Sequence, residues 1–274
     1  MLEKIIYKNH INESLEFGNF PLFVNANDLH DFAWEITSKN DKISTFQKGI
    51  VSKTMPIIIA CNSEAEGVAF RNKLFEVFEK DVLAKQHGKI YIGDYYLKCF
   101  ITGSKKAEYL VNKKYMYVEL TVQTDYPEWV KETTTVYSQF AEGTSEYLDF
   151  PVGYSFDYAN ELLNGLIENT NFVASNFRLT IYGQISKPTL YIGGHGYSVD
   201  VDVAAGEYLT IDSVAKTIVL TKVNGEQVNC FNKRDRDSYI FEKIPAGTNA
   251  FSSPNESIYF DITLLDERSE PKWI

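Results

Sequence analysis

Alternation of apolar and polar positions is clearest in residues 208–229, which read YLTIDSVAKTIVLTKVNGEQVN. Leu209 and Ile211 alternate with polar neighbours, and Thr217–Val223 continues a period of two, which is the period of a half-buried β-strand. Asn224–Gly225 follows, and this dipeptide favours a type I′ turn because both central residues of that turn need positive φ. The segment therefore predicts a β-meander that contains a tight hairpin.

The rest of the second half has the same character. Phe177–Gly183 and Thr189–Ile192 fit strands around a turn at residues 185–188, and Ser257–Leu264 fits a further strand. Short strands at such spacing predict a β-sandwich. Residues 161–168, ELLNGLIE, fit either a helix or a strand, and their periodicity does not decide between the two.

The period changes in the first half, where a helix is predicted at about residues 64–86. Ser63 and Glu66 form an S-x-x-E capping box, in which the hydroxyl and the carboxylate each satisfy a free backbone N–H. Gly88 is placed to end the helix. The apolar side chains expected on one helical face are Phe70, Leu74, Phe75, Phe78 and Val82.

The remainder of the first half predicts strands. Residues 5–24 fit two short strands around a polar turn at 9–13, and Pro56–Ala60 fits a fully apolar strand. A half-buried strand is predicted by the alternating residues Phe32, Trp34 and Ile36. Further strands are expected at Ile90–Ile92, at Tyr95–Ile101 and at Tyr115–Gln123, the last with Met116, Val118, Leu120 and Val122 on its buried face.

A polar segment rich in Thr and Ser, residues 131–146, predicts a link between two domains. The expected fold class is mainly β. A first β-rich domain with one α-helix is expected at residues 1–130, and a β-sandwich domain is expected at residues 147–274.

Composition and charge narrow the function classes. The chain has 274 residues, of which 44% are hydrophobic and 14% aromatic, so it can bury substantial cores. Its net charge is −10, and residues 1–130 carry 16 Lys+Arg against 17 Asp+Glu, whereas residues 131–274 carry 11 against 20. Neither half has the basic excess of a nucleic-acid-binding protein, so we expect no direct contact with nucleic acid.

The sequence carries no membrane signal. The N-terminus has charges at Glu3, Lys4 and Lys8 and no apolar core of a signal peptide, and the longest apolar run, Met55–Cys61, is too short to cross a bilayer. The three cysteines are odd in number and widely spaced, which is typical of a chain made in a reducing cytosol. We therefore expect no membrane association and no disulfide framework.

The sequence gives only weak support for a catalytic or metal-binding site. His195 lies in a glycine-rich turn, residues 193–196, with neither a G-x-S-x-G elbow for a nucleophile nor a following helix that could bind phosphate. A calcium site could use the acids that follow, but the spacing of a calcium-binding loop is absent. These acids are Asp200, Asp202, Glu207 and Asp212. We expect a turn histidine and solvated acids, and hence no enzyme activity, no metal and no cofactor.

Trp273 follows the charged run DERSEPK. A tryptophan in such a position is useful only if it docks against another surface, which makes Trp273 a candidate docking anchor. A frayed tail is the alternative that the residues leave open.

Several segments together resemble the distal tail protein family of siphophages, the long-tailed, non-contractile phages and prophages of Gram-positive bacteria. The opening IIYKNHINESLEFGNFPLF is similar to the first strands of that family, the predicted helix takes the place of its single helix, and TDYPEW at 124–129 resembles the end of its first domain. Further similar segments are FRLTIYGQISKPTLYIGG, GEYLTIDSVAKTIVL, FEKIPAGTNAF and RSEPKW.

This resemblance implies a structural protein of the virion tail tip, assembled in the bacterial cytoplasm. Its first domain would form a homo-hexameric hub ring that joins the tail tube to tail-tip or receptor-binding proteins. Its second domain would be a galectin-like β-sandwich that projects outward. A ring needs exposed contact surfaces, and the hairpin within Tyr95–Val122 is the candidate. The residues expected at that interface are Tyr96, Tyr115 and Tyr117.

Two other hypotheses remain. The first is a carbohydrate-binding β-sandwich module for attachment to the host surface, and its stacking residues would be Tyr182, Tyr191, Tyr197 and Tyr208. The second is an enzyme that hydrolyses peptidoglycan, for which the sequence shows no nucleophile, base or metal grouping.

Overall fold

A computed structural model describes residues 4–109, 114–137, 163–255 and 258–273, and it divides the chain into two compact units. The first unit comprises residues 1–131 and 267–274, and the second comprises residues 132–266. The chain passes into the second unit within β10 (Trp129–Tyr137) and returns within β21 (Tyr259–Arg268). Of the predicted link at 131–146, residues 131–137 belong to β10, and the rest lies outside the described residues.

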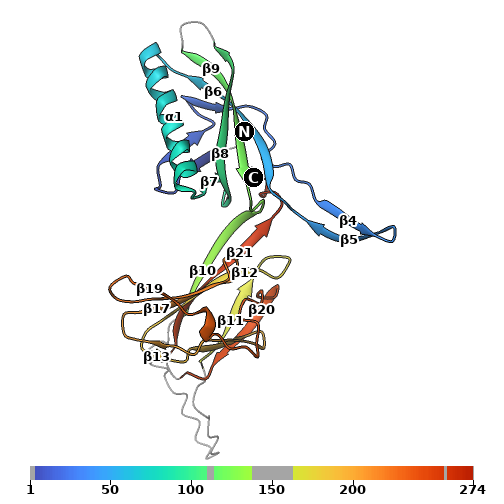
Figure 1. The fold of residues 1–274 in the computed structure, drawn as a ribbon, viewed down its shortest axis with the longest axis vertical. Helices are drawn as coiled ribbons and strands as arrows, with labels where there is room; N and C mark the ends of the chain where they lie inside the picture. Colours follow the sequence, from blue (N-terminus) through green and yellow to red (C-terminus); the bar gives the residue numbers. More distant parts are fainter. Residues whose placement is uncertain (1–3, 110–113, 138–162, 256–257, 274) are drawn as a thin grey trace, which may run out of the picture. The chain divides into compact units, whose positions relative to one another are not determined.

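The first unit is built from antiparallel sheets that share one long strand, β8 (Tyr95–Tyr109). The other strands of these sheets, besides β10, are β1 (Ile5–Lys8), β2 (Ser14–Phe17), β3 (Leu22–Val24), β6 (Val51–Ala60), β7 (Gly88–Ile92) and β9 (Tyr115–Thr124). One sheet has the order β10-β8-β7-β1-β2, and the other has the order β8-β9-β6-β3. The expected mainly β class with one α-helix is confirmed (Figure 1).

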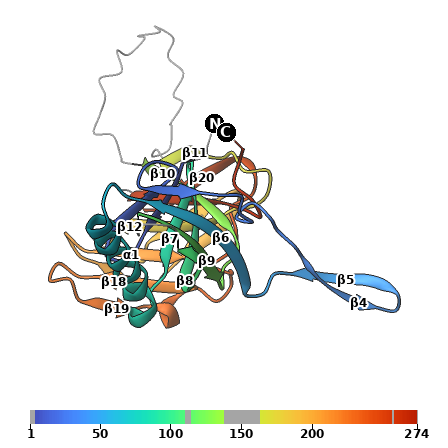
Figure 2. The ribbon, with the colours of Figure 1, turned by 90° about the horizontal axis from the view of Figure 1, so that it is seen from above.

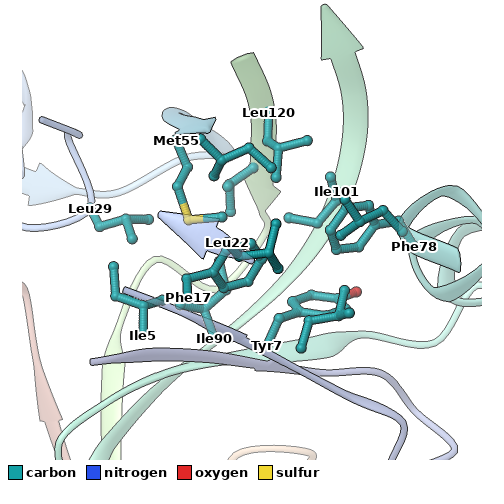
Figure 3. Close-up of a cluster of buried hydrophobic side chains, with 14 of the residues drawn as sticks. Ile5, Tyr7, Phe17, Leu22, Leu29, Met55, Phe78, Ile90, Ile101 and Leu120 are labelled. Atoms are coloured by element: carbon teal, nitrogen blue, oxygen red, sulfur yellow. The ribbon is translucent and has the colours of Figure 1, made fainter. Parts of the chain in front are cut away.

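The core of the first unit lies between these sheets and the helix (Figure 3). Met116, Val118 and Leu120 on β9 are buried in it, whereas Tyr115 on the same strand is exposed. This is the alternation that the sequence predicts, because successive side chains of a strand point to opposite faces. The apolar side chains labelled in Figure 3 come from β1, β2, β3, β6, β7, β8, β9, the helix and the loop after β3.

Helix α1 (Glu64–Ala84) begins at the predicted cap. Ser63 Oγ accepts a hydrogen bond from Glu66 N–H at 3.2 Å, and Glu66 Oε2 accepts one from Asn62 N–H at 3.0 Å. The predicted end is wrong, because Lys85 closes the helix in a left-handed conformation with φ 53°, and its N–H donates to the Asp81 and Val82 carbonyls.

The predicted apolar face of α1 is only partly correct. Leu74 and Phe78 are buried, but Phe75 is 63% exposed and Val82 is 37% exposed. Val77 takes their place in the core. The other fully buried position on this face is a carboxylate, Asp81, which hydrophobic periodicity cannot reveal.

Asp81 connects α1 to the first strand and the turn after it. Its Oδ2 accepts a hydrogen bond from Tyr7 Oη, and its Oδ1 accepts one from His10 N–H at 2.9 Å and lies 2.5 Å from His10 Nδ1. Burial and the bond to Asp81 raise the pKa of Tyr7 well above its usual range, so the phenol remains a donor. Gly88 permits this approach, because a Cβ there would collide with the Tyr7 hydroxyl and the Asp81 carboxylate.

The second unit is a sandwich of two antiparallel sheets with a buried apolar core. One sheet has the order β19-β18-β17-β12-β21-β10, the other has the order β11-β20-β14-β15, and β13 and β16 form a separate pair. The strands are β11 (Leu163–Asn169), β12 (Asn176–Tyr182), β13 (Ile185–Ser186), β14 (Thr189–Ile192), β15 (His195–Ser198), β16 (Asp202–Val203), β17 (Tyr208–Asp212), β18 (Thr217–Thr221), β19 (Gln227–Asn229) and β20 (Gly247–Ser253). The segment at 161–168 that periodicity left open is therefore a strand from residue 163.

The hairpin after β18 differs from the prediction in its turn. Gly225 has φ 83°, but Asn224 is not among the residues with positive φ. Gly225 N–H donates to the Lys222 carbonyl at 2.9 Å, and Lys222 N–H donates to the Glu226 carbonyl at 2.9 Å. This is a type I turn followed by a left-handed glycine, a three-residue loop, rather than a two-residue type I′ turn.

Asn169 connects several buried polar groups of the second unit. Asn169 Nδ2 donates to the carbonyls of Val173, Ile244 and Pro245 at 3.3, 2.9 and 3.1 Å. Its Oδ1 accepts hydrogen bonds from Asn171 N–H at 3.1 Å and from Ser175 Oγ at 3.0 Å. Because Asn169 is only 3% exposed, its own amide group has little access to water as a substitute partner.

The Asp81 contact predicts a loss of stability when it is removed. Asp81→Ala leaves the Tyr7 hydroxyl and the His10 N–H without an acceptor, and we expect the free energy of unfolding to fall by about 2–5 kcal/mol. Asp81→Asn keeps an acceptor oxygen and should cost less. Urea denaturation, followed by the fluorescence of the buried Trp129, measures both effects. Glu76→Ala, an exposed change on the same helix, is the control, and an Asp81→Ala variant as stable as this control contradicts the prediction.

The hydrogen bonds of Asn169 predict that the isosteric substitution Asn169→Asp destabilises the second unit. Asn169→Asp replaces an amide that donates to three carbonyls by a second acceptor, and we expect it to lower the free energy of unfolding by about 2–4 kcal/mol. Asn224→Asp is the matched control, because Asn224 uses only its oxygen, which accepts from Glu226 N–H at 3.0 Å. Thermal unfolding of the two variants should differ clearly. Equal midpoints would show that the amide donors of Asn169 contribute little.

Candidate assembly surfaces

Two strands of the first unit form a projection that we call the arm, residues 32–50. Its strands, β4 (Glu35–Lys39) and β5 (Lys42–Gln47), pair with each other and with no other strand of the described residues. All residues of both strands are exposed. Figures 1 and 2 both show the pair extending away from α1.

The arm turns at Asn40 and Asp41. These residues have φ of 53° and 58°, and a type I′ turn requires positive values at both of its central positions. Asn and Asp tolerate this left-handed conformation better than most residues do. A type I′ turn was predicted at residues 224–225, but the structure has this type of turn at Asn40 and Asp41, at the tip of the arm.

The arm exposes several large apolar side chains. Ile36, Ile43 and Phe46 are 58%, 57% and 59% exposed. The prediction of a half-buried strand at Phe32, Trp34 and Ile36 is wrong, because all of these side chains are exposed. A gathering of exposed apolar side chains is typical of an interaction surface.

Lys48 holds the root of the arm on the first unit. Its Nζ donates to Glu128 Oε1 and to Ser269 Oγ, both at 2.8 Å, and lies 4.4 Å from the centroid of the Trp34 ring. The Lys48 side chain is only 7% exposed, so this ion pair is less screened by water than an ordinary surface pair. The root is therefore tied down while the tip remains exposed.

The C-terminal segment lies against the loop that leads into the arm. The Trp273 ring stacks on His30 with centroids 4.1 Å apart, and Tyr126 Oη donates to Glu267 Oε1. Trp273 is still 72% exposed. The candidate docking anchor thus contacts its own chain through one ring face and presents the rest of its side chain on the surface.

A second surface of the first unit is a cavity of about 260 Å³ between α1 and the β6-β9-β8 sheet, which we call the α1 groove. Arg71, Glu79 and Lys106 are its charged lining residues, and the exposed Phe75 also belongs to the lining. The other apolar side chains of the lining are Ile57, Ile59, Leu74, Phe78, Ile101, Met116, Val118 and Leu120. An apolar hollow with few polar groups is the usual form of a site that receives another side chain or a ligand.

The structure does not bring the three predicted interface tyrosines together. Tyr115 and Tyr117 lie at the start of β9, paired with Ala60 and Ile58 of β6, and Tyr115 is 49% exposed. Tyr96 lies at the start of β8, where it pairs with Val130 and is only 6% exposed. Tyr115 and Tyr117 share the outer face of their sheet, and Tyr96 belongs to a different region of the unit.

The tyrosines considered for sugar stacking also separate. Tyr182 and Tyr208 are cross-strand neighbours on β12 and β17, with ring centroids 6.0 Å apart. Tyr197 is buried and donates to the Glu242 carbonyl at 2.8 Å, and Tyr191 lies on the other sheet. Tyr259 on β21 joins the first pair, with its centroid 5.0 Å from that of Tyr182. Its alternation with the apolar Ile258 and Phe260 was the sequence signal that could have identified it.

The residues considered for catalysis or calcium have local roles. His195 Nε2 lies 2.9 Å from the Tyr239 carbonyl, and Asp212 Oδ1 accepts hydrogen bonds from the N–H groups of Val214 and Ala215 at 2.9 and 2.8 Å. Within the described ranges, no group of three or more His, Cys, Asp or Glu side chains is arranged to hold a metal ion. The helical part of the same ranges includes no segment with the length and apolar character needed to span a bilayer.

Comparison of the whole chain with known proteins gives a result at the level of structure alone. No family model and no curated protein sequence matches the chain. Among solved structures, the Dit protein of phage SPP1, described as a paradigm of the hub adsorption apparatus in phages that infect Gram-positive bacteria, superposes with a TM-score of 0.62 at 9% identity. That match covers 98% of this chain and 100% of the SPP1 protein.

Chains of the phage P2 baseplate in its activated conformation are similar as well. The form with calcium gives a TM-score of 0.59 at 13% identity, and the form with strontium gives 0.59 at 14% identity. Each match covers 96% of this chain and 98% of the baseplate chain. The chain therefore has the fold of phage hub and baseplate proteins over nearly its whole length, as the resemblance of its segments to distal tail proteins predicted.

Proposed function

We propose that this protein is a structural subunit of a phage or prophage tail tip, without catalytic activity. In this role it forms a hub ring that joins the tail tube to tail-tip or receptor-binding proteins. One observation carries the proposal, which is the match of nearly the full length of both units to hub and baseplate proteins. Its place of action is the virion tail tip, and its place of assembly is the bacterial cytoplasm.

The domain roles follow from this proposal. The first unit, with the arm and the α1 groove, forms the ring, and the second unit is the galectin-like sandwich that carries tip or receptor-binding proteins. A ring of six copies closes through heterologous contacts, in which one surface of a copy meets a different surface of the next copy. The arm and the α1 groove are two such surfaces on one unit.

The arm is directed away from the groove of its own chain, since Figures 1 and 2 show it extending to the side opposite α1. We therefore assign the groove of the next copy as its partner. Ile36, Ile43 and Phe46 each contribute about 1.5–3 kcal/mol when they move from water into an apolar site. The lining of the α1 groove supplies such a site, with Phe75 already exposed.

A stable ring contact needs more than the three apolar side chains of the arm, since a typical interface uses about 20–30 residues on each side. A standard interface buries about 800 Å² on each partner, so further contacts are needed. Tyr115 and Tyr117, on the outer face of β9, are candidates for this additional area, and Trp273, beside the root of the arm, is a candidate anchor. Tyr96 offers little surface to such a contact, because it is only 6% exposed and its ring packs beside Tyr91 and Lys89.

The arm-to-groove contact can be tested by complementation. Variant A combines Ile36→Ser with Phe46→Ser on the arm, and variant B carries Phe75→Glu in the groove. We expect the parent protein to form closed rings and each variant alone to remain monomeric. A mixture of A and B should stop at heterodimers, because only the arm of B and the groove of A are intact. Light scattering on a size-exclusion column measures the three masses.

The control for this experiment is Phe172→Ser, which changes a phenylalanine of the second unit that is even more exposed than Phe46 and Phe75, and it should leave the rings intact. Rings in variant A would falsify the role of the arm. Rings in the A and B mixture would show that the arm and the groove are not two halves of one contact. A parent protein that is monomeric at all concentrations contradicts ring formation by this chain alone.

The outer face of β9 gives a separate prediction. Tyr115→Ser combined with Tyr117→Ser changes only the outer face of the strand, so the free energy of unfolding should stay within about 1–2 kcal/mol of the parent value and the unit should remain folded. Ring mass in light scattering should fall, because part of the contact area is lost. Tyr239→Ser, an exposed tyrosine of the second unit, is the matched control. Unchanged rings in the double variant would remove β9 from the interface.

A further inference from the structure

A row of three tyrosines crosses the outer face of one sheet of the second unit. Tyr182 of β12 stands in register between Tyr208 of β17 and Tyr259 of β21. The ring centroids are 6.0 Å apart for Tyr182 and Tyr208 and 5.0 Å apart for Tyr182 and Tyr259. We call this set the tyrosine row.

The tyrosine row faces away from the core. The residues that precede or follow its members, Ile181, Leu209 and Phe260, are fully buried, so the alternating side chains point outward. Tyr208 and Tyr259 are 37% and 43% exposed. Three aromatic rings thus lie on the outer face of the sheet, with Tyr182 beside each of the other two, where they contribute nothing to the core.

Polar groups continue the surface beside the row. The next register along the same strands consists of Thr210, Thr180 and Asp261. Tyr182 Oη donates to Asp261 Oδ2 at 2.6 Å, which holds the central ring in place and leaves Asp261 Oδ1 as an acceptor for another partner. This bond, together with burial, raises the pKa of Tyr182 to about 12, so the phenol stays protonated at neutral pH.

The chemistry of this surface limits what it can bind. Aromatic rings offer flat apolar faces, and the neighbouring hydroxyl and carboxylate groups offer hydrogen bonds, which together match a pyranose chain with its C–H faces and its hydroxyls. The spacing of the rings is similar to the width of one sugar ring. On the neighbouring strand β18, Thr221 continues the Tyr register and Val219 continues the Thr register, so hydroxyl groups and one aliphatic side chain lie beside the row.

Charge excludes one class of polymer. The second unit, residues 132–266, carries 8 Lys+Arg against 18 Asp+Glu, so its net charge is −10. Asp261 is the one charged residue of the two registers. Teichoic acids, uronates and nucleic acids are repelled by such a field, whereas an uncharged saccharide is not.

We propose that the tyrosine row is a binding site for a neutral saccharide chain, whose sugar rings stack on Tyr182, Tyr208 and Tyr259 while their hydroxyls bond to Thr180, Thr210 and Asp261. This activity goes beyond the hub role. It belongs to the second unit and does not depend on ring formation. It adds a surface-contact function to a subunit whose first role is assembly.

The test uses the full-length protein and isothermal titration with neutral hexasaccharides, namely maltohexaose, cellohexaose and chitohexaose. Poly(glycerol phosphate) is the anionic comparison. We expect at least one neutral probe to bind and the anionic polymer not to bind. Tyr182→Ala should weaken binding about tenfold, the size of one lost stacking contact. Tyr182→Phe keeps the ring but loses its bond to Asp261, so it should weaken binding less.

Tyr191→Ala is the matched control, because Tyr191 is 45% exposed on the other sheet and outside the row. It should leave the affinity unchanged. Tyr259→Ala, at an exposed end of the row, repeats the test if Tyr182→Ala proves unstable in thermal unfolding. Three results overturn the proposal: no binding of any neutral probe, equal binding of the anionic polymer, or a loss of affinity with Tyr191→Ala but not with the row variants.

Discussion

The buried carboxylate of Asp81 is the contact on which the arrangement of the first unit depends. It brings the Tyr7 hydroxyl and the His10 backbone onto α1, and Gly88 leaves the space for this approach. A buried carboxylate is costly unless its acceptors are used, so this contact favours one placement of the helix over others. Because α1 also forms a wall of the α1 groove, the polar contact helps to fix the shape of the groove that we propose as an assembly surface.

Large apolar side chains lie in two kinds of place in this protein, the buried cores and the exposed arm. Most strands place them in the core of their own unit, where burial stabilises the fold. The arm keeps Ile36, Ile43 and Phe46 exposed. Exposed apolar side chains lower solubility, so a group of them is typical of an interaction surface. Lys48 keeps the root of the arm in place, so that the tip can reach outward without loss of order at its base.

The two units also divide the charge. The first unit carries 19 Lys+Arg and 19 Asp+Glu, whereas the second carries 8 and 18. A neutral unit is suited to close packing against copies of itself, since like charges do not accumulate in the assembly. An acidic unit repels other acidic units and anionic polymers. This division of charge is consistent with the proposed assembly role of the first unit and with the proposed saccharide site of the second.

Local sequence determined the elements whose causes are local. The cap at Ser63, the alternation along β9 and the strands β12, β14, β17 and β18 depend on residues one to four positions apart, and they were predicted. The segment of β11 was left open, and β13, β15, β16 and β20 were not predicted. The alternation at Trp34 and Ile36 looks the same as that of a core strand, and only the tertiary structure decided that it faces solvent. The same holds for the tyrosine row, in which only the tertiary structure brings Tyr182, Tyr208 and Tyr259 side by side. Burial and cross-strand register arise from contacts between distant residues, which periodicity cannot encode.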